Sequence, residues 1–213
     1  MALSKADVNN INITPVASKA IKWNSAADGF EAGALGGSMV LLSTLTASSS
    51  ATLSFTSSID STYNSYLFKF IHIHAATEGA HFTVNFRDGG SAFDATKTTS
   101  VFSTYHDEAG NNDPLGYKTS RHLANGTGTA DLAPDLGNDN DQATSGEFLL
   151  FNPSSTTFVK HFTARSSVGH VQPSSMDFLT TGYCNVTAAI DGVQFKMDSG
   201  NIDAGVIKMY GIT

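Results

Sequence analysis

The sequence has little of what many classes of protein depend on. It contains one cysteine, Cys184, five prolines and one tryptophan among 213 residues, and only 15% of its residues are charged. A single cysteine excludes an intrachain disulfide. Because no histidine or basic residue adjoins Cys184 in the sequence to stabilise a thiolate, we expect it to pack as a small apolar side chain.

Positive charge is scarce as well. There are 12 Lys and Arg residues against 19 Asp and Glu residues, which gives a formal net charge of -7. Binding to nucleic acid requires clustered basic residues that neutralise phosphates, so we expect no nucleic-acid partner. No segment approaches the roughly 20 apolar residues of a membrane span, and the N-terminus lacks the apolar core of a secretory signal. We therefore expect that the protein does not insert into a membrane. We also expect that it is made in a reducing compartment.

What is abundant is typical of β structure. The chain has 25 Ser, 23 Thr, 19 Gly and 14 Phe residues, which favour short strands and polar turns. Runs of strand-like pattern with turn formers between them predict an all-β, antiparallel β-sandwich of jelly-roll type. The predicted strands are 39–46, 51–56, 66–74, 81–87, 147–152, 158–166, 176–181, 184–190, 193–197 and 206–212.

Three connections predict hairpins. Residues 66–87 contain two apolar strands around the loop 75–80, which indicates an antiparallel pair. Asp191-Gly192 lies between two apolar runs and is a strong hairpin turn, and residues 198–201 form another. Residues 106–146 hold little but turn formers and acids, so we expect there a protruding excursion with at most short strands.

The first 36 residues differ from the rest. Apolar residues are scattered there, no period persists, and the stretch ends in several glycines, which predicts an extended arm with at most one short helix or strand and then a hinge. We expect two parts, an attachment arm over 1–36 and the sandwich over 37–213. The arm cannot fold alone, so a partner would cover its apolar residues. These are Ile11, Ile13, Val16, Ile21, Trp23 and Phe30.

Residues that could carry chemistry are few. His72 and His74 are spaced to place two imidazoles on one zinc, but no third ligand is evident, and a sheet surface or a subunit seam is the simpler interpretation. The oxygen-rich loop 131–141 could hold calcium but does not match the helix-loop-helix pattern, so we interpret it as solvated. Acidic pairs around 106–108 and 198–203 could cleave a glycosidic bond. We expect no catalytic residue, metal or cofactor, and a protein that is not an enzyme.

Aromatic residues in the predicted loops suggest binding surfaces. Tyr105, Tyr117 and Tyr183 could stack on sugar rings, pack at a subunit contact or cover the ends of the sandwich, because a phenol combines an apolar plane with a polar tip. The sequence does not separate these three roles.

Three segments resemble a known group of proteins. Residues 20–45 (AIKWNSAADGFEAGALGGSMVLLSTL), 57–73 (SSIDSTYNSYLFKFIHI) and 186–212 (VTAAIDGVQFKMDSGNIDAGVIKMYGI) are similar to virion structural proteins of marine tailed bacteriophages. The resemblance implies a structural subunit displayed on the tail or its appendages and attached to other virion proteins through the arm. It places the protein in the virion, assembled in the host cytoplasm.

Other functions stay open beside this one. The close variant is a capsid decoration protein, and the more distant ones are a receptor module for a host surface glycan and a glycan-cleaving enzyme. Small β-sandwiches often share apolar surface around a symmetry axis, so we expect a homotrimer.

Overall fold

The computed structural model describes residues 19–23, 26, 29–34 and 39–213. The chain divides into two compact units, Met1–Ser38 and Met39–Thr213. The expected boundary at 36/37 lies two residues from this division. Ile11, Ile13 and Val16 lie outside the described residues.

The first unit contains a two-stranded antiparallel hairpin of β1 (Lys19–Trp23) and β2 (Phe30–Ala34). The sequence predicted at most one short element here, and that expectation was wrong. The two strands pair in register from Lys19 opposite Ala34 to Trp23 opposite Phe30, with an ion pair of 3.1 Å between Lys22 and Glu31. Contacts between side chains on the two strands stabilise this hairpin. A search for a persistent hydrophobic period does not detect such contacts.

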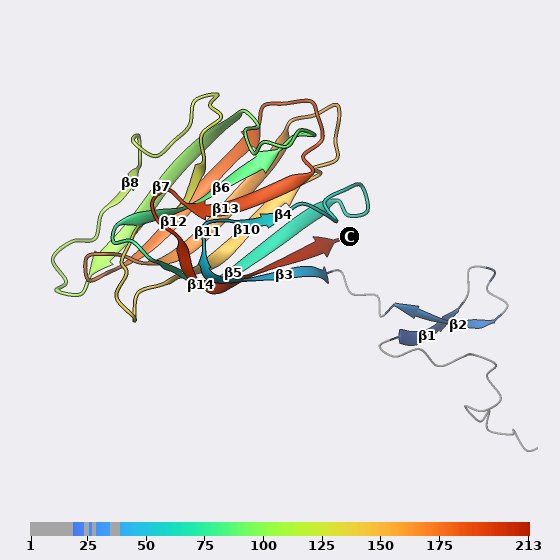
Figure 1. The fold of residues 1–213 in the computed structure, drawn as a ribbon, viewed down its shortest axis with the longest axis horizontal. Helices are drawn as coiled ribbons and strands as arrows, with labels where there is room; N and C mark the ends of the chain where they lie inside the picture. Colours follow the sequence, from blue (N-terminus) through green and yellow to red (C-terminus); the bar gives the residue numbers. More distant parts are fainter. Residues whose placement is uncertain (1–18, 24–25, 27–28, 35–38) are drawn as a thin grey trace, which may run out of the picture. The chain divides into compact units, whose positions relative to one another are not determined.

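The second unit is built on a large antiparallel sheet of eight strands (Figure 1). Their order across the sheet is β3-β14-β5-β10-β11-β12-β7-β8. The bounds are β3 (Met39–Ser50), β5 (Ser65–Ala75), β7 (Lys97–Asp107), β8 (Leu115–Tyr117), β10 (Thr144–Phe151), β11 (Lys160–Gly169), β12 (Ser174–Cys184) and β14 (Ile202–Ile212).

A smaller sheet of four strands packs on the large one. Its order is β4-β13-β6-β9, with β4 (Leu53–Phe55), β13 (Gly192–Met197), β6 (Ala80–Arg87) and β9 (Ala130–Leu136). All pairings in both sheets are antiparallel. The prediction of an all-β sandwich is therefore confirmed. None of the described segments forms a helix long and apolar enough to cross a membrane.

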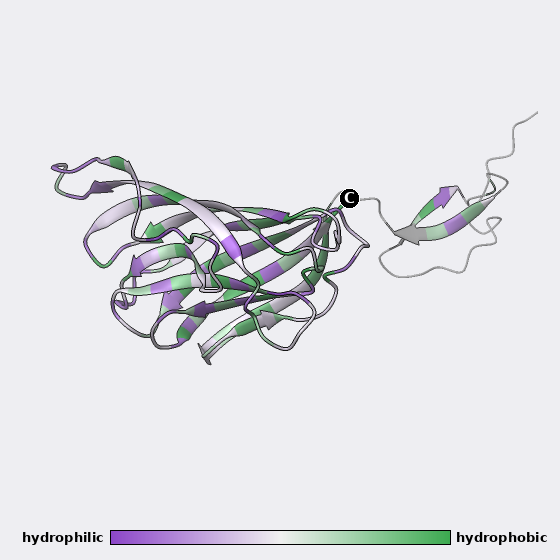
Figure 2. Ribbon diagram, turned by 90° about the horizontal axis from the view of Figure 1, so that it is seen from above, coloured by the Kyte–Doolittle hydropathy of each residue, from purple (hydrophilic) through white to green (hydrophobic). Residues whose placement is uncertain are grey.

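Phenylalanine fills the space between the sheets. Phe148 is fully buried and its ring lies 5.6 to 6.2 Å from the rings of Phe68, Phe86, Phe162 and Phe195. Hydrophobic and hydrophilic residues alternate along many strands (Figure 2), as expected where one face of a sheet is buried and the other solvated.

Two lysines extend into the same interior. Lys97 and Lys160 are buried and lie opposite Cys184 on the two neighbouring strands. Their ammonium groups donate to backbone carbonyls, Lys97 to Gly128 O at 2.6 Å and Lys160 to Val186 O at 2.7 Å. Burial lowers the pKa of Lys97 to about 8 and raises that of the Cys184 thiol to about 12. The prediction that Cys184 packs as an apolar side chain is confirmed by its complete burial.

The predicted hairpin over 66–87 is wrong. Its two strands, β5 and β6, belong to different sheets and face each other across the core, with the Phe70 and Phe82 rings 5.3 Å apart. Both strands bury large side chains. Two such strands can either pair within one sheet or pack face to face from two different sheets. Their sequence pattern is the same in both cases.

The two predicted turns near the C-terminus also connect different sheets. Residues 185–190 form no strand, and Asp191-Gly192 leads from β12 in the large sheet into β13 in the small one. Asp191 accepts a hydrogen bond of 2.8 Å from Arg87 Nε at this crossing. The connection 198–201 returns the chain from β13 to β14 in the large sheet.

The expected excursion over 106–146 is built into the sandwich in part. It supplies β8 at one edge of the large sheet and β9 at one edge of the small sheet. Ala130, Leu132 and Leu136 of β9 are buried despite the acids between them. Pro134 fits there because an edge strand leaves one row of backbone groups unpaired.

Candidate functional site

The hairpin of the first unit has one apolar face. Trp23 and Phe30 lie opposite each other, their rings stacked with centroids 4.4 Å apart, and Ile21 lies on the same face two residues before Trp23. The exposed fractions of Ile21, Trp23 and Phe30 are 52%, 61% and 45%. Half of the predicted arm residues are thus brought together on one small sheet, exposed to solvent.

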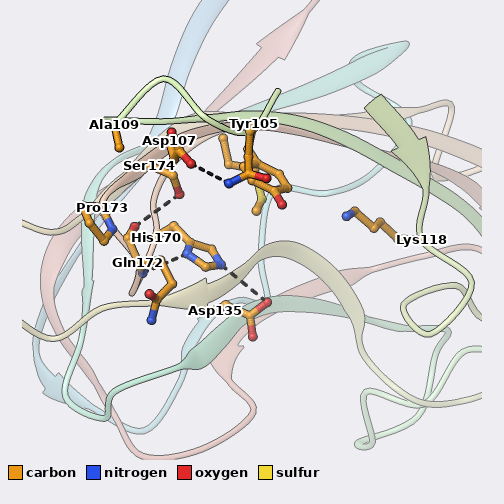
Figure 3. A pocket seen from close by; sticks show the side chains of 11 residues that line it. Tyr105, Asp107, Ala109, Lys118, Asp135, His170, Gln172, Pro173 and Ser174 are labelled. Atoms are coloured by element: carbon orange, nitrogen blue, oxygen red, sulfur yellow. Dashed lines mark hydrogen bonds and ion pairs between the residues drawn. The ribbon is translucent and has the colours of Figure 1, made fainter. Parts of the chain in front are cut away.

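A pocket of about 450 Å³ lies in the second unit, where β7 ends and β12 begins (Figure 3). Asp107 and Ser174 are register partners at this end of the large sheet, and the loops that follow β7 and precede β12 form the rim. The lining residues are Tyr105, Asp107, Ala109, Asn112, Lys118, Asp135, His170, Gln172, Pro173, Ser174 and Met176.

One wall of the pocket is apolar. Tyr105 and Met176 are opposite each other on β7 and β12, on the face of the sheet turned toward the interior. The Lys118 ammonium lies 5.8 Å from the centre of the Tyr105 ring. Figure 3 shows it pointing inward between Tyr105 and Asp135.

The carboxylate of Asp107 is held by its own loop. It accepts hydrogen bonds from Asn111 N at 2.8 Å and Asn112 Nδ2 at 2.6 Å. The backbone hydrogen bond from Asn111 is the main reason why the pKa of Asp107 lies below its usual range. The group is therefore ionised and serves as a hydrogen-bond acceptor.

Asp135 connects the pocket to a cluster of charged side chains beneath it. It accepts a hydrogen bond of 2.8 Å from Arg121 Nη2, and its other oxygen lies 3.4 Å from His81 Nε2. On the pocket side, His170 Nε2 lies 3.9 Å from Asp135. The contact with His81 is the main reason why the pKa of Asp135 lies below its usual range.

His81 is at the centre of this cluster. Its Nδ1 lies 3.6 Å from carboxylate oxygens of both Asp131 and Asp198, and Arg121 Nη1 contacts the ring, lying 2.8 Å from Nε2. Hydrogen bonding to Asp131 and then to Asp135 raises the pKa of His81 to about 9, against the opposing effects of burial and of the Arg121 charge. The cluster fixes β6, β9 and the loop of Arg121 to one another.

The other two predicted tyrosines lie elsewhere. Tyr117 is exposed on the edge strand β8, and its hydroxyl is 3.1 Å from His122 Nδ1. Tyr183 lies at the opposite end of β12, with its ring centre 5.9 Å from that of His161. Of the three, only Tyr105 lines the pocket.

The residues weighed as metal ligands are not gathered into a site. Among the described residues no group of three or more histidine, cysteine or acidic side chains could hold a metal ion. His74 interacts with Asp203 at 3.4 Å, and a left-handed residue at His72 (φ 49°) interrupts the alternation of β5. Asp131 and Asp135 are strand residues paired with Arg121 and His81, so the expected solvated loop 131–141 was wrong for this part.

Most of the pocket was not predicted. Lys118, Asp135, His170, Gln172 and Met176 come from three separated parts of the chain, and none belongs to a recognisable motif. Tyr105 and the acidic pair at 107–108 were the nearest signals, since Tyr105 and Asp107 both line the pocket.

No protein-family model, no curated protein and no solved structure matches this chain.

Proposed function

We propose that this protein is a structural subunit of a tailed-bacteriophage virion, attached to other virion proteins through its N-terminal hairpin. The observation that carries this proposal is the apolar face of Ile21, Trp23 and Phe30, exposed on a sheet of only two strands. An isolated two-stranded hairpin is marginally stable in water, so burying this face against a partner would stabilise it.

The strand order supports a jelly roll as the displayed domain. Strands β3-β14-β5-β10 of the large sheet and β4-β13-β6-β9 of the small one have the order of eight jelly-roll strands that cross repeatedly between two sheets. The pairs β7-β8 and β11-β12 then extend the large sheet. Jelly rolls are common in viral capsid and lectin domains, which agrees with a role in display.

A tailed-phage virion is proposed as the particle because three segments resemble virion proteins of marine tailed phages. These segments are 20–45, 57–73 and 186–212. The first of these segments includes the hairpin except for Lys19, and the last includes β13 and β14. The tail or its appendages is the proposed location, with capsid decoration as the variant that particle imaging would distinguish.

An apolar row on the outer face of the large sheet offers a surface that the proposed homotrimer would bury. Leu41, Tyr210, Leu67 and Leu149 are register partners on the four neighbouring strands β3, β14, β5 and β10. Leu41 is 52% exposed and the others are half-buried. Native mass spectrometry of the full chain should give the mass of three chains, and a monomer at micromolar concentration would refute the trimer.

The decisive experiment is incorporation into particles. A chain lacking residues 1–36 should fold but be absent from purified virions, and Trp23→Ser in the full chain should reduce its occupancy strongly. Phe158→Ser is the matched control, because Phe158 is a 71% exposed aromatic on a loop of the sandwich. Normal occupancy of the truncated chain would contradict the proposal.

A further inference from the structure

We propose that the pocket between β7 and β12 binds an acidic sugar residue, that is, one ring of a polysaccharide that carries a carboxylate or a sulfate. This inference goes beyond the structural role and does not depend on what the hairpin binds. It commits to one of the roles considered for Tyr105, stacking on a sugar, and adds the charge of the ligand.

The size and position of the pocket fit a ligand. Its volume of about 450 Å³ falls within the range of small-molecule sites, and its rim is made of loops held by hydrogen bonds rather than by a single strand. Ser174 Oγ donates to Gln172 O at 3.2 Å, and Gln172 N donates to His170 Nδ1 at 2.9 Å. The rim is therefore shaped before a ligand arrives.

The wall of Tyr105 and Met176 supplies an apolar surface for a sugar ring. One face of a pyranose consists of C–H groups, which pack against an aromatic plane. Around this wall stand short polar groups that can contact hydroxyls, namely Ser174, Asn112 and Gln172. Among the described residues only the backbone of Gln172 makes hydrogen bonds, so its side-chain amide is free for a ligand.

The acceptors of the pocket are already occupied. Asp107 is bound by Asn111 and Asn112, and Asp135 by Arg121 beside His81. The charge of Asp135 is thus balanced by groups outside the pocket, and the Asp107 carboxylate is held by two amide N–H groups of its own loop.

The ammonium group of Lys118, by contrast, remains open. Within the part of the chain that the structure describes, Lys118 Nζ has no carboxylate within 4.0 Å. His170 accepts a hydrogen bond from Gln172 N at Nδ1, and its Nε2 faces the Asp135 carboxylate at 3.9 Å (Figure 3). An ammonium group beside an aromatic ring favours an anionic group attached to a sugar ring.

The test is a glycan array probed with the full chain. The array presents hexuronate, sialylated and sulfated oligosaccharides, each beside its neutral counterpart, and affinities are then measured by titration calorimetry. We expect binding to at least one acidic glycan, at least about tenfold weaker binding of its neutral form, and weakening with added salt.

Variants assign the binding to the pocket. Lys118→Met should weaken it by about tenfold or more, and Lys118→Arg should restore most of it. Lys196→Met, a lysine on β13 without an acidic partner among the described residues, is the matched control and should bind as the unaltered chain does. Absence of binding to every acidic glycan, equal binding of the neutral forms, or full affinity of Lys118→Met would each overturn the proposal. None of these outcomes bears on whether the protein is incorporated into virions, so the two proposals fail independently.

Discussion

At the scale of single residues, His81 links stability to pH. Its pKa is about 9 in the folded protein, against about 6.5 when exposed. Because the folded state holds the proton more tightly, the stabilisation is fully present below about pH 6.5 and is lost as pH rises through 9. Its size is on the order of 2 to 3 kcal/mol.

Urea unfolding of the unaltered chain and of His81→Gln between pH 5.5 and 9.5 measures this contribution. The difference in unfolding free energy between the two should shrink as pH increases from 6.5 to 9. Taking this difference cancels the contributions of titrating groups that both proteins share. One of these is Lys97, whose pKa of about 8 makes the unfolding free energy rise with pH instead. A difference that is constant over this range would contradict the assignment.

Gly205 shows how a single backbone position can be decisive. It has φ of +124°, and a Cβ there would lie 2.7 Å from His72 O and 2.8 Å from Ile73 Cα. Gly205→Ala should therefore cost about 2–4 kcal/mol of unfolding free energy, measured by urea denaturation. Gly116→Ala, where no atom lies within 4 Å, should change stability by less than about 0.5 kcal/mol. Equal costs for the two variants would be inconsistent with this explanation.

At the scale of the elements, stability depends on the aromatic contacts between the sheets. Phe148 of β10 contacts Phe195 of the small sheet and Phe162 of its own sheet. Phe148→Ala should lower the unfolding free energy by about 3–5 kcal/mol, because it removes buried area and leaves a cavity. Phe158→Ala at an exposed site should cost less than about 0.5 kcal/mol in the same denaturation experiment.

The elements also explain which predictions failed. The strands around 66–87 and after Asp191-Gly192 were located, but they were paired with the wrong neighbours. Alternation of apolar and polar residues reports that one face of a strand is buried. It does not report which strand lies beside it, and here successive strands mostly cross between the sheets.

At the scale of the whole molecule, the two units differ in how they are stabilised. The buried core comprises residues of 39–213, and no described residue of the hairpin belongs to it. The segment 39–213 expressed alone should therefore unfold cooperatively, with a midpoint within about 2 °C of that of the full chain by calorimetry. A large loss of stability would contradict this prediction.

The sequence alone determined that this protein is an antiparallel β-sandwich, that Cys184 is buried, and that Trp23 and Phe30 belong to a separate N-terminal part. These properties follow from local patterns of apolar residues and from composition. Only the tertiary structure decided the strand order, the place of β9 and the pocket of Tyr105, Lys118 and His170. Such features depend on contacts between residues far apart in the chain, and the free energy of those contacts leaves no periodic trace in the sequence.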